Sequence, residues 1–424
     1  MVGAPMEARD TAAPAAWREE GNAFPFDPRD PVFRADPYPT YDRLRETSPV
    51  LQSALGLLVL SRHRDCVSLL HHTQTSTDQR NSVLFQAYLQ TLDEDPFDGR
   101  EPSFLFLDPP DHTRLRGLVS HAFTPRRVRD LGPRIQEIVD ELIDAAVANG
   151  GLEAIEELAY LVPVRVICEL LGVPAADHEI FKNWSRQLAR GLDPDFMIPE
   201  DTRRQMMEAS EALRSYFEGL ITERTANPGD DMLSALIHAE QEGDKLTHGE
   251  LLSTLGLLLI AGHETTVNLI GNGLLQLNRH PDEYAKLCED PSLARHAVEE
   301  TLRFDPPVQI TGRIAMTELR FDGQTLAPGF QAICLLGGAN RDPEEFGETA
   351  GTFDITRSPN NHVAFGAGIH FCLGAPLARV EAKITLETFA RRIGPFELLE
   401  EPGYRENFVL RGLSKLPVAF KKRG

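Results

Sequence analysis

The chain has 424 residues, of which 42% are hydrophobic and 7% aromatic, and glycine and proline are too infrequent for a fibrous or disordered protein. Its formal net charge of −21 repels nucleic acid and anionic lipid, so we expect no nucleic-acid partner and favour small-molecule or protein partners. A chain of this length can bury a large core, as one domain or as two.

The N-terminal segment lacks the features of a targeting signal. Residues 1–24 are rich in Ala and Pro, carry charges of both signs and have no apolar stretch. We expect a mobile tail there and one folded domain over residues 25–424. The longest apolar run, 251–262, is shorter than the roughly 20 residues that a membrane-spanning helix needs. We therefore expect no membrane anchor, a cytoplasmic location and a monomer.

Helical patterns dominate the folded part. A short helix is predicted at 36–50, where prolines bound the pattern, and a strand rich in Leu and Val at 56–63. Longer helical patterns follow at 134–151, 211–227, 254–281 and 292–307. Strands return within 323–337, where Asp322-Gly323 and Pro328-Gly329 are turn signals. The sequence thus predicts a mainly α single domain with a minor β region.

One predicted helix becomes polar inside an apolar run. After residues 257–262 come His263, Glu264, Thr265 and Thr266, and each of these groups needs a partner if it is buried. His263-Glu264 begins the zinc motif H-E-x-x-H, but Val267 stands where the second histidine should be. The polar residues therefore do not form this kind of zinc site.

The five cysteines are odd in number, scattered and without a C-x-x-C pair, which disfavours disulfides and structural zinc. Four of them are typical of small buried hydrophobic residues: Cys66, Cys168, Cys288 and Cys334. Cys372 differs, because glycines surround it and an amphipathic helical pattern follows. Glycine lets the backbone lie flat against a planar group, and a helix N-terminus favours a thiolate.

Three chemistries use such a thiolate. A cysteine nucleophile needs a suitably placed base, and His370, two residues away, seldom has that geometry. A dinucleotide-binding loop needs a third glycine where Phe371 stands. An axial thiolate ligand to haem iron fits the glycine loop, the helix start and an isolated cysteine.

The run Phe365-Gly366-x-Gly368-x-His370-x-Cys372-x-Gly374 resembles the cysteine-ligand signature of the cytochrome P450 superfamily at every defining position. The resemblance extends from about Phe26 to the end of the chain. It implies a helix-rich, single-domain fold around a buried haem b. Cys372 would be the iron ligand, and the other residues in contact with haem would include Phe365, Gly366 and Ala261.

The resemblance also assigns charged residues. Glu300-x-x-Arg303, with Arg357 further on, is similar to the buried structural network of the family, although Glu and Arg three apart are by themselves usually a solvated pair. Four residues would hold the haem propionates, because guanidinium and imidazole groups donate hydrogen bonds to carboxylates: His112, Arg116, Arg313 and His370.

Ala261-Gly262-x-Glu264-Thr265 resembles the oxygen-groove motif of the family. Ala261 and Thr265 are four apart on one helix face, and the Thr265 hydroxyl can bond to the Ala261 carbonyl. Glu264 and Thr265 would relay protons as the catalytic pair. The alternative for Glu264 is a buried acid paired with a cation on another helix. We expect His263 and Thr266 to have structural or supporting roles.

These assignments favour a monooxygenase that uses O2 and two external electrons. The alternatives are a haem-thiolate peroxygenase and a haem-binding sensor without turnover, neither of which requires the Glu264-Thr265 pair. The chain has no flavin or NAD fingerprint and no iron–sulfur cysteine set, so a ferredoxin and a ferredoxin reductase would supply the electrons. A cationic cluster could bind the ferredoxin, or could be an ordinary solvated helix start: Arg126, Arg127 and Arg129.

Segments that line the substrate pocket in the family are mostly apolar here. This composition suits hydroxylation or epoxidation of a lipophilic molecule such as a fatty acid, terpenoid, steroid or polyketide. Apolar residues are also common in an ordinary core. The candidate pocket residues are Phe104, Phe106, Phe196, Met197, Val308, Ile310, Val409 and Leu410.

Overall fold

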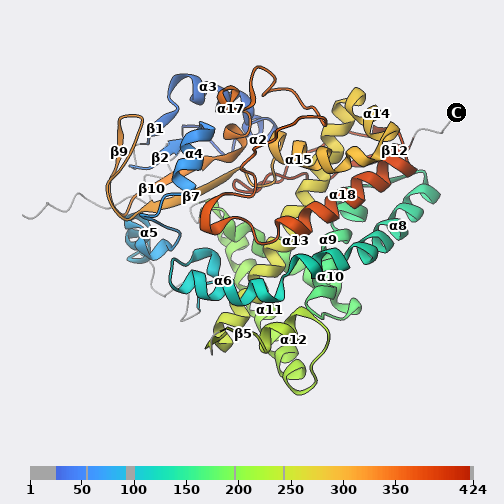
Figure 1. Cartoon of the computed structure of the whole chain (residues 1–424), viewed down its shortest axis with the longest axis horizontal. Helices are drawn as coiled ribbons and strands as arrows, with labels where there is room; N and C mark the ends of the chain where they lie inside the picture. Colours follow the sequence, from blue (N-terminus) through green and yellow to red (C-terminus); the bar gives the residue numbers. More distant parts are fainter. Residues whose placement is uncertain (1–24, 54–55, 92–100, 195–196, 242–243, 421–424) are drawn as a thin grey trace, which may run out of the picture.

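The computed structural model describes residues 25–53, 56–91, 101–194, 197–241 and 244–420. The expected tail over 1–24 lies outside the described residues. Within them the chain is mainly helical with small sheets, as predicted. Figure 1 shows β1, β2, β7, β9 and β10 gathered at one side of the molecule and most of the long helices at the other, with β12 among those helices.

The helices vary widely in length. The first group covers the N-terminal half: α2 (Pro31–Ala35), α3 (Tyr38–Thr47), α4 (His63–Leu70), α5 (Val83–Leu89), α6 (Asp111–Ala122), α7 (Pro125–Asp130), α8 (Gly132–Asn149), α9 (Leu161–Leu170) and α10 (His178–Leu188). The second group covers the rest: α11 (Glu200–Ala226), α12 (Met232–Ile237), α13 (His248–Arg279), α14 (Pro281–Glu289), α15 (Ala294–Phe304), α16 (Leu336–Ala339), α17 (Pro343–Phe346) and α18 (Ala375–Arg392). All four long helical patterns are confirmed as helices.

The main sheet joins early and late segments in the order β1-β2-β10-β7-β3. Its strands are β1 (Val50–Gln52), β2 (Leu58–Leu60), β3 (Thr75–Ser76), β7 (Ile310–Ala315) and β10 (Gln331–Leu335). In the central strand, Ile333 pairs with Val59 in parallel and with Gly312 antiparallel. This sheet positions β7, which carries Arg313.

The remaining strands form smaller sheets. They are β4 (Gly151–Glu153), β5 (Glu240–Gln241), β6 (Asp244–Lys245), β8 (Leu319–Phe321), β9 (Gln324–Leu326), β11 (Phe396–Leu398) and β12 (Pro417–Phe420). The predicted turns are confirmed, because Asp322, Gly323 and Gly329 all have positive φ angles. The predicted strand region 323–337 is therefore two strands, β9 and β10.

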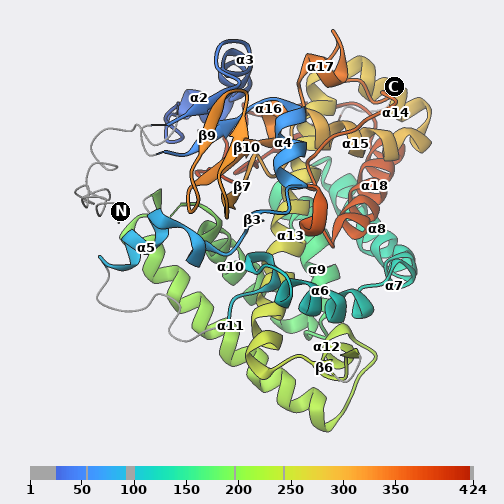
Figure 2. The ribbon, with the colours of Figure 1, turned by 60° about the vertical axis from the view of Figure 1, so that its left-hand side comes forward.

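Helix α13 runs through the middle of the molecule (Figure 2). A capping box between Thr247 and Glu250 begins it, which satisfies two backbone N–H groups that the helix leaves free. Nearly every residue from His263 to Leu277 is buried, because α13 packs against α9, α15 and α18. A helix that is buried on all sides is the central element of a core.

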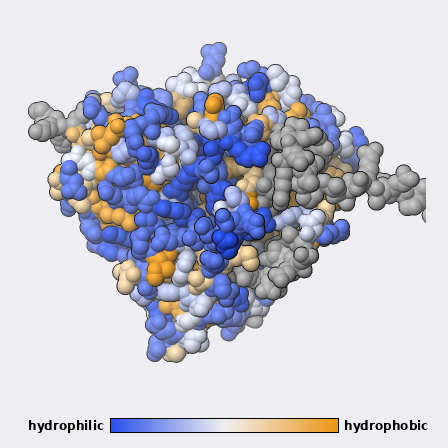
Figure 3. Space-filling model, turned by 180° about the vertical axis from the view of Figure 1, so that it is seen from behind, coloured by the Kyte–Doolittle hydropathy of each residue, from blue (hydrophilic) through white to orange (hydrophobic). Residues whose placement is uncertain are grey.

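The face of the molecule opposite to that of Figure 1 is largely hydrophilic. Figure 3 shows that hydrophobic residues occur on it in scattered spots. Among the described helices, none is both long enough and apolar enough to cross a membrane. Of the four cysteines expected to be small core residues, Cys66, Cys168 and Cys334 are buried and Cys288 is half-buried.

Candidate active site

The loop before α18 holds Cys372 in a fixed position. The Cys372 N–H donates to the Phe365 carbonyl at 3.0 Å, which closes the loop on itself. Gly366 and Gly368 have φ angles of 70° and 69°, a region that other residues rarely adopt. A Cβ at Gly368 would also collide with the Leu70 carbonyl oxygen. The loop therefore requires glycine for its path.

The ionisation of Cys372 differs from the sequence-based expectation. Burial raises the pKa of this thiol, although the N–H groups of Gly374 and Ala375 and the charges of Arg116 and Arg379 act in the opposite direction. The N–H groups at the helix start act in the expected direction, but in the chain alone desolvation of the sulfur outweighs them. A metal cation at the sulfur would reverse the balance, since a coordinating thiol is deprotonated.

Four candidate propionate residues lie together. His112 and His370 have ring centroids 4.2 Å apart, and the positive charges of Arg116 and Arg313 act on both imidazoles. His112 is only 2% exposed, yet neither ring nitrogen has a hydrogen-bond partner. Buried polar atoms are almost always paired, so these nitrogens call for an acceptor from outside the chain.

The electrostatics of this cluster fit an anionic group. Burial and the nearby positive charges lower the pKa of His370 to about 3. Burial also lowers the pKa of Arg313. Within the described chain, neither Arg116 nor Arg313 forms an ion pair with a carboxylate. Two carboxylates would offset this repulsion and satisfy the free donors, which is what the propionates of haem supply. The residues present fit the cofactor.

The middle of α13 presents a face that protein side chains do not cover. Ala261 is exposed and Thr265 half-buried, although Leu259 and His263 on other faces of the helix are fully buried. The Thr265 hydroxyl donates to the Ala261 carbonyl at 2.9 Å, as the spacing predicted. Small side chains at 261 and 262 leave room beside the backbone for a small ligand.

Glu264 points to different partners. Its carboxylate is 2% exposed and accepts hydrogen bonds from the Tyr160 hydroxyl at 2.9 Å and from Arg405 Nη1 at 3.0 Å. This arrangement is the alternative raised from the sequence, a buried acid paired with a cation. The cation comes from the C-terminal segment between β11 and β12 rather than from a helix.

His263 contacts a neighbouring helix. Its Nδ1 lies 2.8 Å from the Ser185 hydroxyl on α10, and burial lowers its pKa, which favours the neutral imidazole. Across the described ranges no group of three or more His, Cys, Asp or Glu residues could hold a metal ion. A zinc site at His263-Glu264 thus has no geometric support.

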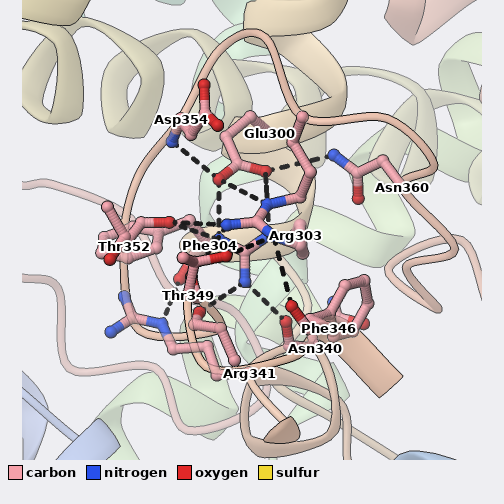
Figure 4. Close-up of polar contacts among 12 residues, drawn as sticks. Glu300, Arg303, Phe304, Asn340, Arg341, Phe346, Thr349, Thr352, Asp354 and Asn360 are labelled. Carbon is pink, nitrogen blue, oxygen red and sulfur yellow. Dashed lines mark hydrogen bonds and ion pairs between the residues drawn. The ribbon is translucent and has the colours of Figure 1, made fainter.

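Glu300 and Arg303 lie in one buried network (Figure 4), and Arg357 joins it through Glu300. Arg303 donates to both oxygens of Glu300, at 2.7 and 2.8 Å, and to the carbonyls of three loop residues. These residues are Asn340, Ala350 and Thr352. Arg357 Nε lies 3.3 Å from Glu300 Oε1. Because the carboxylate of Glu300 and the guanidinium of Arg303 have partners on every polar atom, the network fastens α15 to the segment that leads to the cysteine loop.

The candidate pocket residues are only partly brought together. Met197, Ile310 and Val409 share one apolar cluster beside the main sheet, whereas Phe104 is buried in a different cluster among the helices. Val308 pairs with Leu410 through an isolated β-bridge. Phe106 is 37% exposed. Phe196 lies outside the described residues.

Sequence reasoning missed Tyr160 and Arg405, the partners of Glu264. Tyr160 lies 104 residues before Glu264 and Arg405 lies 141 residues after it. No local pattern connects positions so far apart. The one available signal was the presence of a carboxylate in an apolar helix, which requires a buried partner but does not identify it.

A helix-rich fold with a cysteine on a glycine loop, a cluster of arginines and imidazoles that lack carboxylate partners and an open face on α13 indicates a haem-thiolate enzyme. Comparison with known proteins agrees. Residues 75–404 match the family model described as Cytochrome P450. The chain is 41% identical over 404 residues to the Vitamin D(3) 25-hydroxylase of Pseudonocardia autotrophica. The aligned residues cover 92% of this chain and 96% of that protein.

Solved structures give the same result. CYP164A2 of Mycobacterium smegmatis, in its ligand-free state, has 45% sequence identity and a TM-score of 0.85, covering 92% of this chain and 98% of that one. The myxobacterial cytochrome P450 CYP267B1, in complex with myristic acid, has 38% sequence identity and a TM-score of 0.85. The match covers 95% of this chain and 100% of that one. The chain belongs to the cytochrome P450 family; it is a P450 monooxygenase with haem b as its cofactor.

Proposed function

We propose that this P450 monooxygenase inserts one oxygen atom from O2 into a lipophilic small molecule, by hydroxylation or epoxidation, with electrons from a ferredoxin and its reductase. The observation that carries the proposal is the uncovered face of α13 at Ala261 and Thr265, where a substrate and O2 can meet. The cluster that contains Met197, Ile310 and Val409 supplies apolar surface for the substrate.

The haem would be held by residues from three parts of the chain, namely α6, β7 and the cysteine loop. Cys372 is the iron ligand, and the propionate partners are His112 and Arg116 on α6, Arg313 on β7 and His370. When bound, the haem would supply the iron and the Cys372 thiolate would donate electron density to it, which supports cleavage of dioxygen. Phe365, Gly366 and Ala261 would contact the ring.

Thr265 and Glu264 would handle the protons. The Thr265 hydroxyl can accept a hydrogen bond while it donates to the Ala261 carbonyl, so it can hold a water molecule or a protonated group at the open face. Each Glu264 oxygen accepts one hydrogen bond, from Tyr160 or from Arg405, and can accept a second one from a water molecule. Such a water molecule would connect Glu264 to the Thr265 hydroxyl in the relay.

The electron donor would bind on the cysteine side. Helix α7 packs against α18, which begins directly after the cysteine loop. Arg126, Arg127 and Arg129 are all exposed on α7, and the Arg126 side chain is 85% exposed. This cationic cluster in an anionic chain suits an acidic protein such as a ferredoxin.

The substrate class is lipophilic. One relative is named for hydroxylation of vitamin D(3), and another was solved with myristic acid. For this chain we propose only that the substrate is lipophilic, and we propose neither vitamin D(3) nor myristic acid as the substrate. The proposed domain covers residues 25–424 and acts as a cytoplasmic monomer.

The test supplies the haem-loaded full chain with ferredoxin, reductase and NADPH under isotopically heavy O2. Fatty acids, steroids, terpenoids and polyketides are tested in turn as substrates, and the masses of the products are measured by mass spectrometry. We expect one heavy oxygen atom in the product of at least one lipophilic compound. Product formed only with added peroxide would reject the proposal in favour of a peroxygenase.

A further inference from the structure

Glu299 joins α15 to two segments, one on each side of the cysteine loop. Its Oε1 accepts a hydrogen bond from Arg379 Nε at 2.6 Å, and its Oε2 accepts one from Arg379 Nη2 at 3.0 Å. His362 Nε2 lies 3.0 Å from the same Oε2. Two parallel bonds between an arginine and a carboxylate fix the direction of the guanidinium as well as its distance. Glu299 thus holds Arg379, on α18, and His362 in one arrangement.

His362 donates the third hydrogen bond to Glu299. The Nδ1 atom of His362 accepts from the Ala364 N–H at 3.3 Å, so the ring hydrogen that Glu299 accepts is on Nε2. Only 3% of the His362 side chain is exposed. Segment 362–365, which leads into the cysteine loop, is therefore also oriented by Glu299.

Arg379 lies against the cysteine loop. Its guanidinium carbon is 4.5 Å from the centre of the Phe365 ring, within the range of a cation–π contact. The Phe365 carbonyl accepts in turn from the Cys372 N–H. Within the described residues Glu299 is the only carboxylate that pairs with Arg379, and 35% of the Arg379 side chain is exposed. Without that carboxylate, the side chain would gain the freedom to turn into water.

The position of the Arg379 charge matters to Cys372. Burial raises the pKa of the Cys372 thiol, and the positive charges of Arg116 and Arg379 act in the opposite direction. A cation beside an iron–thiolate centre stabilises the reduced form more than the oxidised form, because reduction adds a negative charge. The same cation turned into water is screened and acts more weakly. An Arg379 held beside the loop therefore favours the reduced form.

We propose that Glu299 is a positioning residue, which holds Arg379 beside the cysteine loop and so raises the reduction potential of the haem iron. The inference rests on the proposed function, which assigns Cys372 as the iron ligand. Glu299 acts through Arg379, as residues behind a metal ligand adjust the properties of the metal. A more positive potential makes transfer of an electron from the ferredoxin to the iron more favourable.

The test measures the midpoint potential of the haem-loaded full chain by spectroelectrochemistry, without substrate. We expect Glu299→Ala to lower it by about 28 mV, a roughly threefold change in the one-electron equilibrium constant, since a tenfold change is about 59 mV. Arg379→Gln should lower it at least as much, and adding Glu299→Ala to Arg379→Gln should lower it no further. The matched control is Glu387→Ala, which should match the wild type, because Glu387 pairs with Lys383 on the same helix as Arg379.

A second variant separates position from charge. Glu299→Gln removes the negative charge but keeps one accepting oxygen, so its midpoint potential should lie between those of the wild type and Glu299→Ala. A rise in both variants would show that Glu299 acts through its own charge. An unchanged midpoint potential in Glu299→Ala, or a further fall when it is added to Arg379→Gln, would show that Glu299 does not act through Arg379. Each of these results would overturn the inference.

The carbon monoxide complex of the reduced wild-type chain checks the proposed function separately. Without the red-shifted Soret band of a thiolate ligand, Cys372 is not the iron ligand and the inference falls with that assignment. With that band present, the midpoint potentials bear on Glu299 alone. Should Glu299→Ala fail to fold, Glu299→Asp takes its place, because it keeps the charge on a side chain one methylene shorter. It should lower the midpoint potential, and a wild-type value would overturn the inference.

Discussion

Arg405 and Glu264 form a buried ion pair, 3.0 Å long, between the C-terminal segment and the centre of α13. Tyr160 completes it, because its hydroxyl donates to Glu264 and accepts from Arg405 at 2.7 Å. The residue proposed to move protons is therefore also a structural anchor of α13. The two roles can be separated by changing Arg405 and Thr265 independently.

Replacing Arg405 should destabilise the fold. We expect Arg405→Met to lower the free energy of unfolding by about 3–5 kcal/mol, because it leaves the Glu264 charge buried without its cation. Urea unfolding measures this. The control is Arg320→Met, whose partner Glu318 is 55% exposed and whose loss should cost about 0–1 kcal/mol. A double variant with Glu264→Gln that is no more stable than Arg405→Met would contradict the explanation.

Replacing Thr265 should separate electron use from product formation. We expect Thr265→Ala to form roughly tenfold less product per electron and to release the remainder as peroxide, because no hydroxyl holds the proton donor at the open face of α13. Product and peroxide are measured against NADPH consumed. Thr265→Ser keeps the hydroxyl and serves as the control. Equal product yields in the wild type and Thr265→Ala would reject the relay.

The sequence predicts best the features that depend on neighbouring residues. The glycine loop around Cys372 and the bond from Thr265 to Ala261 follow from local spacing. The partners of Glu264 depend on chain segments more than a hundred residues away, and the direction of the Cys372 pKa depends on burial. Helix α11 begins at Glu200, well before the predicted position 211, because its first turns are polar and show no apolar period.

Replacing Arg303 tests the buried network of Figure 4. Lysine keeps the charge but cannot bind both oxygens of Glu300 and also donate to three carbonyls. We therefore expect Arg303→Lys to cost about 3–5 kcal/mol of stability and to lower the yield of haem-loaded protein. Thermal unfolding and the Soret absorbance per chain measure the two effects. Arg320→Lys, at an exposed position, should match the wild type in both.

Neutralising the cationic cluster on α7 tests the binding of the electron donor. We expect the variant with Gln at 126, 127 and 129 to be reduced by ferredoxin roughly tenfold more slowly at low salt. Its reduction should also depend less on salt, because screening then has fewer charges to act on. Stopped-flow reduction under carbon monoxide measures the rate, with dithionite reduction as the control. If ferredoxin reduced this variant at the wild-type rate, the three arginines would be ordinary solvated residues with no role in binding the electron donor.

Glu299 should contribute to stability in acid. Burial would raise the pKa of this carboxyl, but hydrogen bonds from His362 and Arg379 outweigh it and lower the pKa to about 2. The unfolded chain has a Glu pKa of about 4.3, so the contribution is fully present above that pH and is lost as the pH falls toward 2. We expect Glu299→Gln to be less stable than the wild type at pH 7 and to approach it below about pH 3. Glu318→Gln, at an exposed position, should show no such convergence. A stability difference that stays constant from pH 7 to pH 3 would show that the charge of Glu299 is not the cause.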